Sequence, residues 1–169
     1  MRVFVPATMQ LLARWRATGV IDVDTAFAVT PFLREFYASG DTEELEYAAQ
    51  SDAARSSLLL LAGAPDAPRR RVVLALDAPS AQPDAGLGRS VVRLGERPSF
   101  DHVAAAHVDA DGAEDAVGAA VVALLEFEDA RGSRASSGGR SAQYAIEDLE
   151  AHELLWYASQ EIPDLLAES

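Results

Sequence analysis

The sequence contains no cysteine, no lysine and no asparagine among its 169 residues. Without cysteine, disulfides, a thiolate nucleophile and cysteine-ligated zinc or iron–sulfur sites are excluded. Without lysine, Schiff-base chemistry and the lysine of a phosphate-binding loop are excluded. All 14 basic residues are therefore arginines, and together with frequent alanine this composition is typical of a GC-rich genome.

Long apolar runs are also missing, and we expect no leader peptide. No run approaches the roughly 18 apolar residues that a membrane-spanning helix needs, and the first six residues do not follow the pattern of a signal peptide. Apolar residues make up 49% and charged residues 24% of the chain, as in ordinary globular domains. We therefore expect one cytoplasmic domain over residues 1–169, with no cofactor and no metal.

Negative charge is abundant and unevenly distributed. The formal net charge is −13, and residues 101–169 carry 3 Arg against 15 Asp and Glu, a net of −12. Such charge repels phosphate backbones, so it disfavours direct nucleic-acid binding and favours a basic protein partner or a cation. Two other interpretations stay open: a merely solvated acidic face, and a nucleic-acid mimic with carboxylates spaced like phosphates.

Periodic apolar residues predict an alternation of strands and helices. Strands are expected at 2–5, 26–29, 71–77, 90–94, 102–108 and 144–147. Helices are expected at 8–18, 31–39, 41–62, 113–125 and 150–167, and flexible loops at about 78–89 and 128–142. The fold class predicted is α+β or mixed α/β, with a single mixed sheet of about five to six strands covered by about five helices. Residues 102–147 would form a strand–helix–strand crossover.

The clearest local signals lie between residues 30 and 63. Thr30 can cap a helix whose first residue is Pro31, where the missing N–H costs nothing. Asp41 followed by Glu44 has the spacing of a capping box. Gly63 is placed to end the second helix.

The three histidines do not form a metal-binding pattern. His102 and His107 belong to one predicted strand and are five residues apart, so they point to opposite faces. His152 and Glu153 resemble the start of a metalloprotease helix, but Trp156 stands where the second histidine would be. His152 is thus a surface or packing residue, or alternatively a general base.

Two segments, at 33–47 and 152–164, combine polar and aromatic side chains. They could supply seven residues to one cleft as ligand-binding groups: Arg34, Tyr37, Asp41, Glu44, Tyr47, His152 and Trp156. In such a cleft an arginine would hold an anionic group, and a carboxylate or histidine would move a proton. The alternative is that the helices at 31–62 and 150–167 only pack. The basic run at 69–71 could also bind an anion, or could simply begin a strand.

Several motifs resemble an uncharacterised family of small cytoplasmic proteins from high-GC Gram-positive bacteria. They are RVFVP (2–6), VTPFLREFYASGD (29–41), EELEYAA (43–49), RRVVLA (70–75), HELLWY (152–157) and QEIPDLL (160–166). The resemblance covers nearly the whole chain apart from the segments at 78–100 and 128–142. It implies no activity and no catalytic residue.

Three functions remain under consideration. The first is a non-enzymatic protein that acts by protein–protein interaction, with a protein partner or as a homo-oligomer, for which an exposed Trp156 would be a sign. The second is an enzyme or small anionic-ligand binder that uses Arg34, Tyr37, Asp41, Glu44 and His152. The third is the acidic nucleic-acid mimic.

Overall fold

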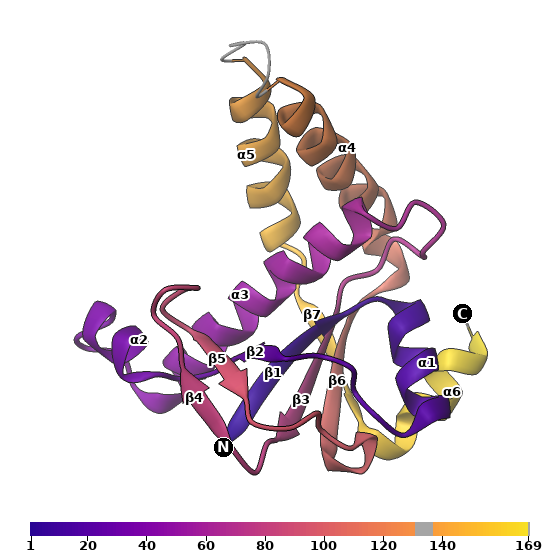
Figure 1. Ribbon diagram of the computed structural model, residues 1–169. Helices are drawn as coiled ribbons and strands as arrows, with labels where there is room; N and C mark the ends of the chain where they lie inside the picture. Colours follow the sequence, from indigo (N-terminus) through magenta and orange to yellow (C-terminus); the bar gives the residue numbers. More distant parts are fainter. Residues whose placement is uncertain (131–136, 169) are drawn as a thin grey trace.

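The computed structural model describes residues 1–130 and 137–168 (Figure 1). Within these ranges the chain forms seven strands and six α-helices. The strands are β1 Arg2–Ala7, β2 Thr25–Phe27, β3 Val72–Asp77, β4 Ala81–Pro83, β5 Val91–Leu94, β6 Val103–Asp109 and β7 Leu154–Ala158. The helices are α1 Met9–Thr18, α2 Pro31–Phe36, α3 Thr42–Ala62, α4 Glu114–Ala130, α5 Ser137–Glu150 and α6 Ile162–Glu168. Short 3-10 turns occupy Phe100–His102, Asp111–Ala113 and Ser159–Glu161.

All seven strands belong to one sheet in the order β4-β5-β2-β1-β3-β6-β7. Every neighbouring pair is antiparallel. The α+β class is confirmed, but the prediction of a mixed sheet with five to six strands is wrong. The additional strand β4 lies inside the predicted loop at 78–89, where three residues pair with β5.

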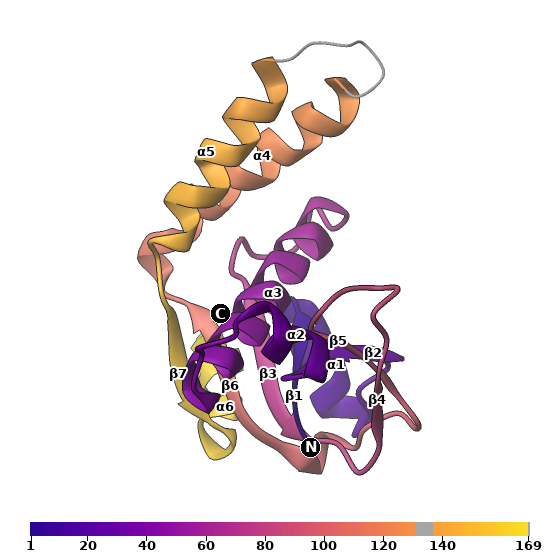
Figure 2. The ribbon, with the colours of Figure 1, turned by 90° about the vertical axis from the view of Figure 1, so that its left-hand side faces the viewer.

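Helices cover the two faces of the sheet unequally. One face packs against α1 and α6, through residues such as Leu12, Trp15 and Ile162, to form the largest apolar cluster. On the other face α3 lies across the strands, and Leu45, Ala49 and Ala53 contact Phe4, Val73 and Ala75. Figures 1 and 2 show α3 on one side of the sheet and α1 with α6 on the other.

Helices α4 and α5 form a hairpin that projects from one end of the sheet (Figure 2). Its base packs on the C-terminal end of α3 through a third apolar cluster that includes Leu58, Leu61, Val117 and Leu149. Residues 128–130 and 137–142, predicted as a loop, are helical, while residues 131–136 of that prediction lie outside the described residues. The predicted strand at 144–147 is also wrong, since it lies within α5. Because the hairpin goes out and returns to the same end of the sheet, β7 runs antiparallel to β6, and the predicted crossover does not occur.

The C-terminal segment differs most from its prediction. Instead of one helix over 150–167, the chain forms β7, a 3-10 turn and the short α6. The Glu161 carboxylate accepts the Ala158 N–H at 2.7 Å. This hydrogen bond caps the 3-10 turn that follows the last residue of β7. Leu155 of β7 is 46% exposed, whereas Ile162 at the start of α6 is fully buried.

The signals between residues 30 and 63 are confirmed. The Thr30 side chain caps α2 with Pro31 in the first turn, and α3 begins with the complete Asp41–Glu44 capping box. Helix α3 ends at Ala62, before Gly63. Within it Leu59 is 61% exposed. No helix among residues 1–130 and 137–168 is long and apolar enough to cross a membrane.

Candidate functional site

A cleft separates α3 from β7 and the end of α5. It consists of two adjoining cavities, of about 400 Å³ and about 580 Å³, that share Tyr47 and Gln50. The smaller one, which we call the His152 cavity, includes Arg55, Glu150 and His152 in its wall. The larger one, which we call the Trp156 groove, runs to Trp156 on the edge strand.

One face of α3 forms the first wall of the cleft. Four residues of this helix line the groove: Glu43, Glu46, Tyr47 and Gln50. The last three follow Glu43 by three, four and seven positions, so all four lie on the same side of the helix. Leu45 and Ala49, which precede Glu46 and Gln50, are buried against the sheet and fix the rotation of the helix about its axis. The ring of Tyr47 is therefore held at the cleft but stays 61% exposed.

Small side chains create the floor of the Trp156 groove. Ala75 on β3 and Ala105 on β6 are directly paired across the sheet, and both line the groove with Phe4 of β1. A larger residue at either alanine would fill this space. Because these two alanines lie side by side on neighbouring strands, the hollow is a consequence of the strand register.

The second wall is the outermost strand of the sheet. Trp156 of β7 is paired with His107 of β6 and is 62% exposed. The Ala158 N–H bonds Glu161 and not β6, so the Ala105–Ala158 pair is of the non-hydrogen-bonded type. Since the two types alternate along an antiparallel ladder, the backbone groups of Trp156 also point to the free edge.

The charges of the Trp156 groove are only partly compensated. Arg2 donates to the Asp77 carboxylate at 3.1 Å across β1 and β3, which cancels one charge of each sign. Glu43 and Glu46 line the groove and have no ion pair among the described residues. The groove is therefore acidic as well as aromatic.

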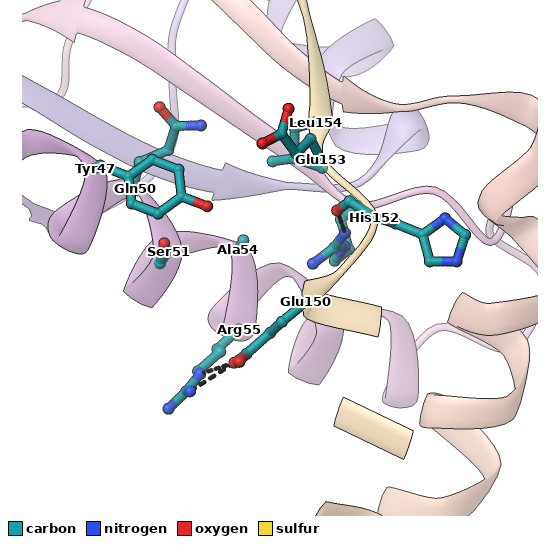
Figure 3. Close-up of a pocket in the computed structure, with 10 residues that line it drawn as sticks. Tyr47, Gln50, Ser51, Ala54, Arg55, Glu150, His152, Glu153 and Leu154 are labelled. Atoms are coloured by element: carbon teal, nitrogen blue, oxygen red, sulfur yellow. Dashed lines mark hydrogen bonds and ion pairs between the residues drawn. The ribbon is translucent and has the colours of Figure 1, made fainter. Parts of the chain in front are cut away.

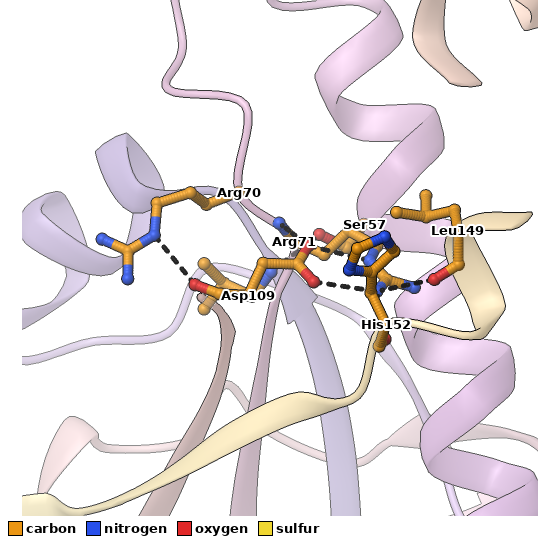
Figure 4. A network of polar contacts seen from close by, with 7 residues as sticks. Ser57, Arg70, Arg71, Asp109, Leu149 and His152 are labelled. Carbon is orange, nitrogen blue, oxygen red and sulfur yellow. Dashed lines mark hydrogen bonds and ion pairs between the residues drawn. The ribbon is translucent and has the colours of Figure 1, made fainter. Parts of the chain in front are cut away.

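Arg71, which lines the His152 cavity, belongs to a buried ion pair that is drawn in Figure 4. Arg71 donates from Nε and Nη2 to the two carboxylate oxygens of Asp109 at 2.9 and 2.8 Å, and its backbone N–H donates to the same carboxylate at 2.8 Å. Nη2 also donates to the His152 carbonyl at 2.9 Å. Asp109 is completely buried and Arg71 is 5% exposed. The pair thus attaches the turn between α5 and β7 to the ends of β3 and β6.

The basic run at 69–71 is used for internal contacts. Arg69 donates to the Leu61 and Ala64 carbonyls at the end of α3, and Arg70 donates to the Asp109 carbonyl. With Arg71 bound to a carboxylate, the run serves as the start of a strand, and the geometry gives no support to its use as an anion site.

Carboxylates also balance the remaining arginine of the His152 cavity. Arg55 pairs with Glu150 at 2.8 Å, and Glu153 is a further carboxylate of the lining. Figure 3 shows Tyr47 and Gln50 on α3 facing the cleft, whereas the His152 imidazole points away from Tyr47. His152 contributes its backbone to this wall, and a proton-transfer role for its ring gains no support from this geometry.

The comparisons with known proteins identify a family. A family model described as a family of unknown function, DUF6912, matches residues 1–166. The chain belongs to the DUF6912 family. No curated protein and no solved structure matches it. The sequence resemblance to a family without an assigned activity is thereby confirmed, while the bacterial origin and cytoplasmic location expected from it stay predictions.

The seven predicted site residues of this DUF6912 chain fall into three places. Tyr47, His152 and Trp156 line the cleft. Tyr37 and Glu44 line a neighbouring hollow that also includes Tyr47. Arg34 and Asp41 line neither the cleft nor this hollow.

Two of the predicted groups have a structural task instead. The Asp41 carboxylate accepts the Glu44 N–H at 2.9 Å, and the Glu44 carboxylate accepts the Asp41 N–H at 3.1 Å. Both carboxylates are thus engaged at the start of α3. The five residues of the anionic-ligand hypothesis do not meet in one cavity.

Sequence reasoning missed several groups that line the DUF6912 cleft. They are Arg2, Phe4, Glu43, Glu46, Gln50, Ala75, Asp77, Ala105 and His107 in the groove, with Ser51, Arg55 and Glu150 in the cavity. Helical spacing from Tyr47 could have found Glu43, Glu46 and Gln50. The strand residues could not be found without the sheet register. No group of three or more His, Asp or Glu in the described part of the chain is arranged to hold a metal.

The pH dependence of DUF6912 stability is expected to reflect His107. Burial, and to a smaller extent the charge of Arg2, lowers the pKa of His107 from the usual 6.5. Below pH 6.5 the folded chain therefore binds fewer protons at His107 than the unfolded chain does. The free energy of unfolding is then highest above pH 6.5 and decreases as the pH falls below this value. Asp77, Glu43 and Glu46 also line this groove.

Urea unfolding between pH 5 and 8 measures this effect. In His107→Gln the free energy of unfolding is expected to decrease less as the pH falls, because the glutamine side chain does not titrate. His102→Gln, a change at an exposed histidine, is the control and should keep the wild-type profile. An unchanged profile in His107→Gln would contradict the assignment.

Proposed function

We propose that this protein is a non-enzymatic binding protein whose α3–β7 cleft receives a segment of a partner protein. The observation that carries the proposal is the pair of exposed aromatic side chains, Tyr47 at 61% and Trp156 at 62%, on two elements that line one groove. Tyrosine and tryptophan are the side chains that most often dominate the energy of protein interfaces.

The backbone of β7 also supports binding of a partner. The strand is at the edge of the sheet, and its outward backbone groups can pair with an added strand. A second copy of this chain is the weaker candidate for this edge, because each copy has a net charge of −13 and would repel the other. A partner with a basic segment agrees better with the charge.

The contacts of the predicted reactive groups agree with binding more than with catalysis. Asp41 and Glu44 are engaged in a helix cap, and Arg71 is engaged by Asp109. The His152 ring points away from the cleft (Figure 3). Asp41, Glu44 and His152 were candidates for proton transfer in the enzyme hypothesis, and Arg71 belongs to the basic run that could have bound an anion.

Affinity capture with an exposed-tyrosine control tests the proposal. The wild-type protein and the double variant Tyr47→Ala/Trp156→Ala are used as baits in a lysate of the source organism. We expect at least one protein to bind the wild type and to be reduced at least about tenfold with the double variant, the loss typical of an interface hot spot.

Tyr144→Ala is the matched control, because Tyr144 is 70% exposed but lies on α5 away from the cleft. The control should retain the captured protein. If every captured protein is retained by the double variant, the cleft is not the binding surface.

A further inference from the structure

The Trp156 groove combines three features that bear on its ligand. Tyr47 comes from α3 and Trp156 from β7, so the two rings belong to different walls. Ala75, Ala105 and Phe4 make the floor apolar. Glu43 and Glu46, one helical turn apart, add two carboxylates to the first wall.

The electrostatic balance of the groove favours a cation. The Arg2 charge is cancelled by Asp77 at 3.1 Å. Burial lowers the pKa of His107, which disfavours a positive charge on its ring. The carboxylates of Glu43 and Glu46 have no ion pair among the described residues, so they are available to an incoming charge.

The shape of the lining favours a long side chain with a charged end. An apolar floor accommodates the methylene stem of such a side chain. The faces of tryptophan and tyrosine attract a cation placed above them. Two carboxylates on one helix face can accept several N–H groups from a planar donor. A guanidinium satisfies all three conditions better than a compact ammonium, since it stacks on aromatic rings and donates in a fork.

We infer that the Trp156 groove binds the guanidinium side chain of an arginine supplied by the partner protein. Tyr47 and Trp156 flank the guanidinium, and Glu43 and Glu46 accept its hydrogen bonds. The inference rests on the proposed function and specifies the chemistry of the partner segment.

The test uses small probes and the indole signals of the protein. N-Acetylarginine amide, N-acetyllysine amide and N-acetylcitrulline amide are titrated into labelled protein and followed by NMR. The chain has two tryptophans, and Trp15 is only 3% exposed, so its indole N–H is an internal reference. The Trp156 signal is assigned with Trp156→Phe.

We expect the arginine probe to shift the Trp156 indole signal with saturation while Trp15 stays unchanged. The citrulline probe has nearly the same shape but no charge, and should bind at least about tenfold more weakly. The lysine probe should lie between them. Equal shifts with arginine and citrulline, stronger binding of the lysine probe, or no shift of Trp156, would overturn the inference.

A pair of charge-matched variants separates the groove from the general negative charge. Glu43→Gln/Glu46→Gln should weaken arginine binding at least about fivefold. Glu114→Gln/Glu126→Gln removes the same charge from α4 and should leave binding within about twofold. Similar losses in both would reduce the effect to non-specific attraction and overturn the inference.

Failure of this inference is distinguishable from failure of the proposed function. If the Tyr47→Ala/Trp156→Ala bait loses a partner but the arginine probe does not bind, the cleft binds a protein by other chemistry. If the bait retains every partner and the probe still binds, the groove recognises arginine but the proposed function is wrong.

Discussion

Asp109→Asn is expected to destabilise the protein by about 3–5 kcal/mol, because it leaves the buried guanidinium of Arg71 without its counter-charge. Asp109 is completely buried and accepts three hydrogen bonds from Arg71, at 2.8, 2.9 and 2.8 Å. An asparagine keeps the shape but carries no charge, and its NH₂ group would face a guanidinium that can only donate. The loss is a large share of the 5–15 kcal/mol by which domains are usually stable.

Urea unfolding with a matched aspartate control measures this loss. Asp111→Asn is the same change two positions along the chain, where the side chain is 92% exposed and its pair with Arg70 is long at 3.8 Å. The control is expected to stay within about 0.5 kcal/mol of the wild type. If Asp109→Asn also stays within about 1 kcal/mol, the carboxylate is not the partner on which Arg71 depends.

The Arg71–Asp109 pair also bears on the cleft. Arg71 donates to the His152 carbonyl at 2.9 Å, so the same pair holds the turn that leads into β7. Hydrogen exchange of β7 should therefore accelerate in Asp109→Asn more than exchange of β1. Equal acceleration throughout would mean that the pair supports only global stability.

Ser57→Ala is expected to destabilise the protein by about 2–4 kcal/mol. The Ser57 hydroxyl donates to the Ala7 carbonyl at 2.7 Å and accepts the Val72 N–H at 3.0 Å, and it thereby joins α3 to the facing ends of β1 and β3. All three residues are completely buried. Alanine would leave two buried backbone groups without a partner, and each such group costs about 1–3 kcal/mol.

The neighbouring serine is the control for this second change. Ser56 is half-buried in the same turn of α3, and Ser56→Ala is expected to change the free energy of unfolding by less than about 0.5 kcal/mol. The two variants have identical composition, so helix propensity cancels in the comparison. Equal stability of both would show that water replaces the Ser57 hydroxyl.

The sequence predicts the structure best where an element is set by residues next to it in the chain. Thr30, Pro31, Asp41 and Glu44 define the starts of α2 and α3 within a few residues of themselves. Such caps act through backbone groups of the next turn and need no distant partner. The starts of these two helices could therefore be predicted correctly.

The C-terminal error had a different physical cause. Leu155, Ala158, Ile162 and Leu166 follow helical spacing, and this pattern indicated one long helix. The free edge of β6 offered the segment at Leu154–Ala158 a hydrogen-bonding partner that the pattern does not contain. Tertiary pairing decided in favour of the strand, for which Trp156 and Tyr157 also have a high propensity.

The candidate site shows the same division. Tyr47, His152 and Trp156 were predicted to share a cleft, and they line the two adjoining cavities. Asp41 and Glu44 were included because they are polar, although their spacing already predicted the capping box that engages both carboxylates. The floor could not be predicted, since Ala75 and Ala105 become neighbours only through the β3–β6 register.

By itself the sequence determined which chemistry is impossible here. Without cysteine and lysine, thiol reactions and Schiff bases on a lysine are excluded, and the net charge of −13 favours a cationic partner. Composition suffices for such statements because they concern which groups exist, irrespective of where they lie. Only the tertiary structure decided which carboxylates of the described residues lack an ion pair and which arginines have one, because pairing depends on which groups lie within hydrogen-bonding distance. The sheet brings those neighbours together from positions as far apart as Arg71 and His152.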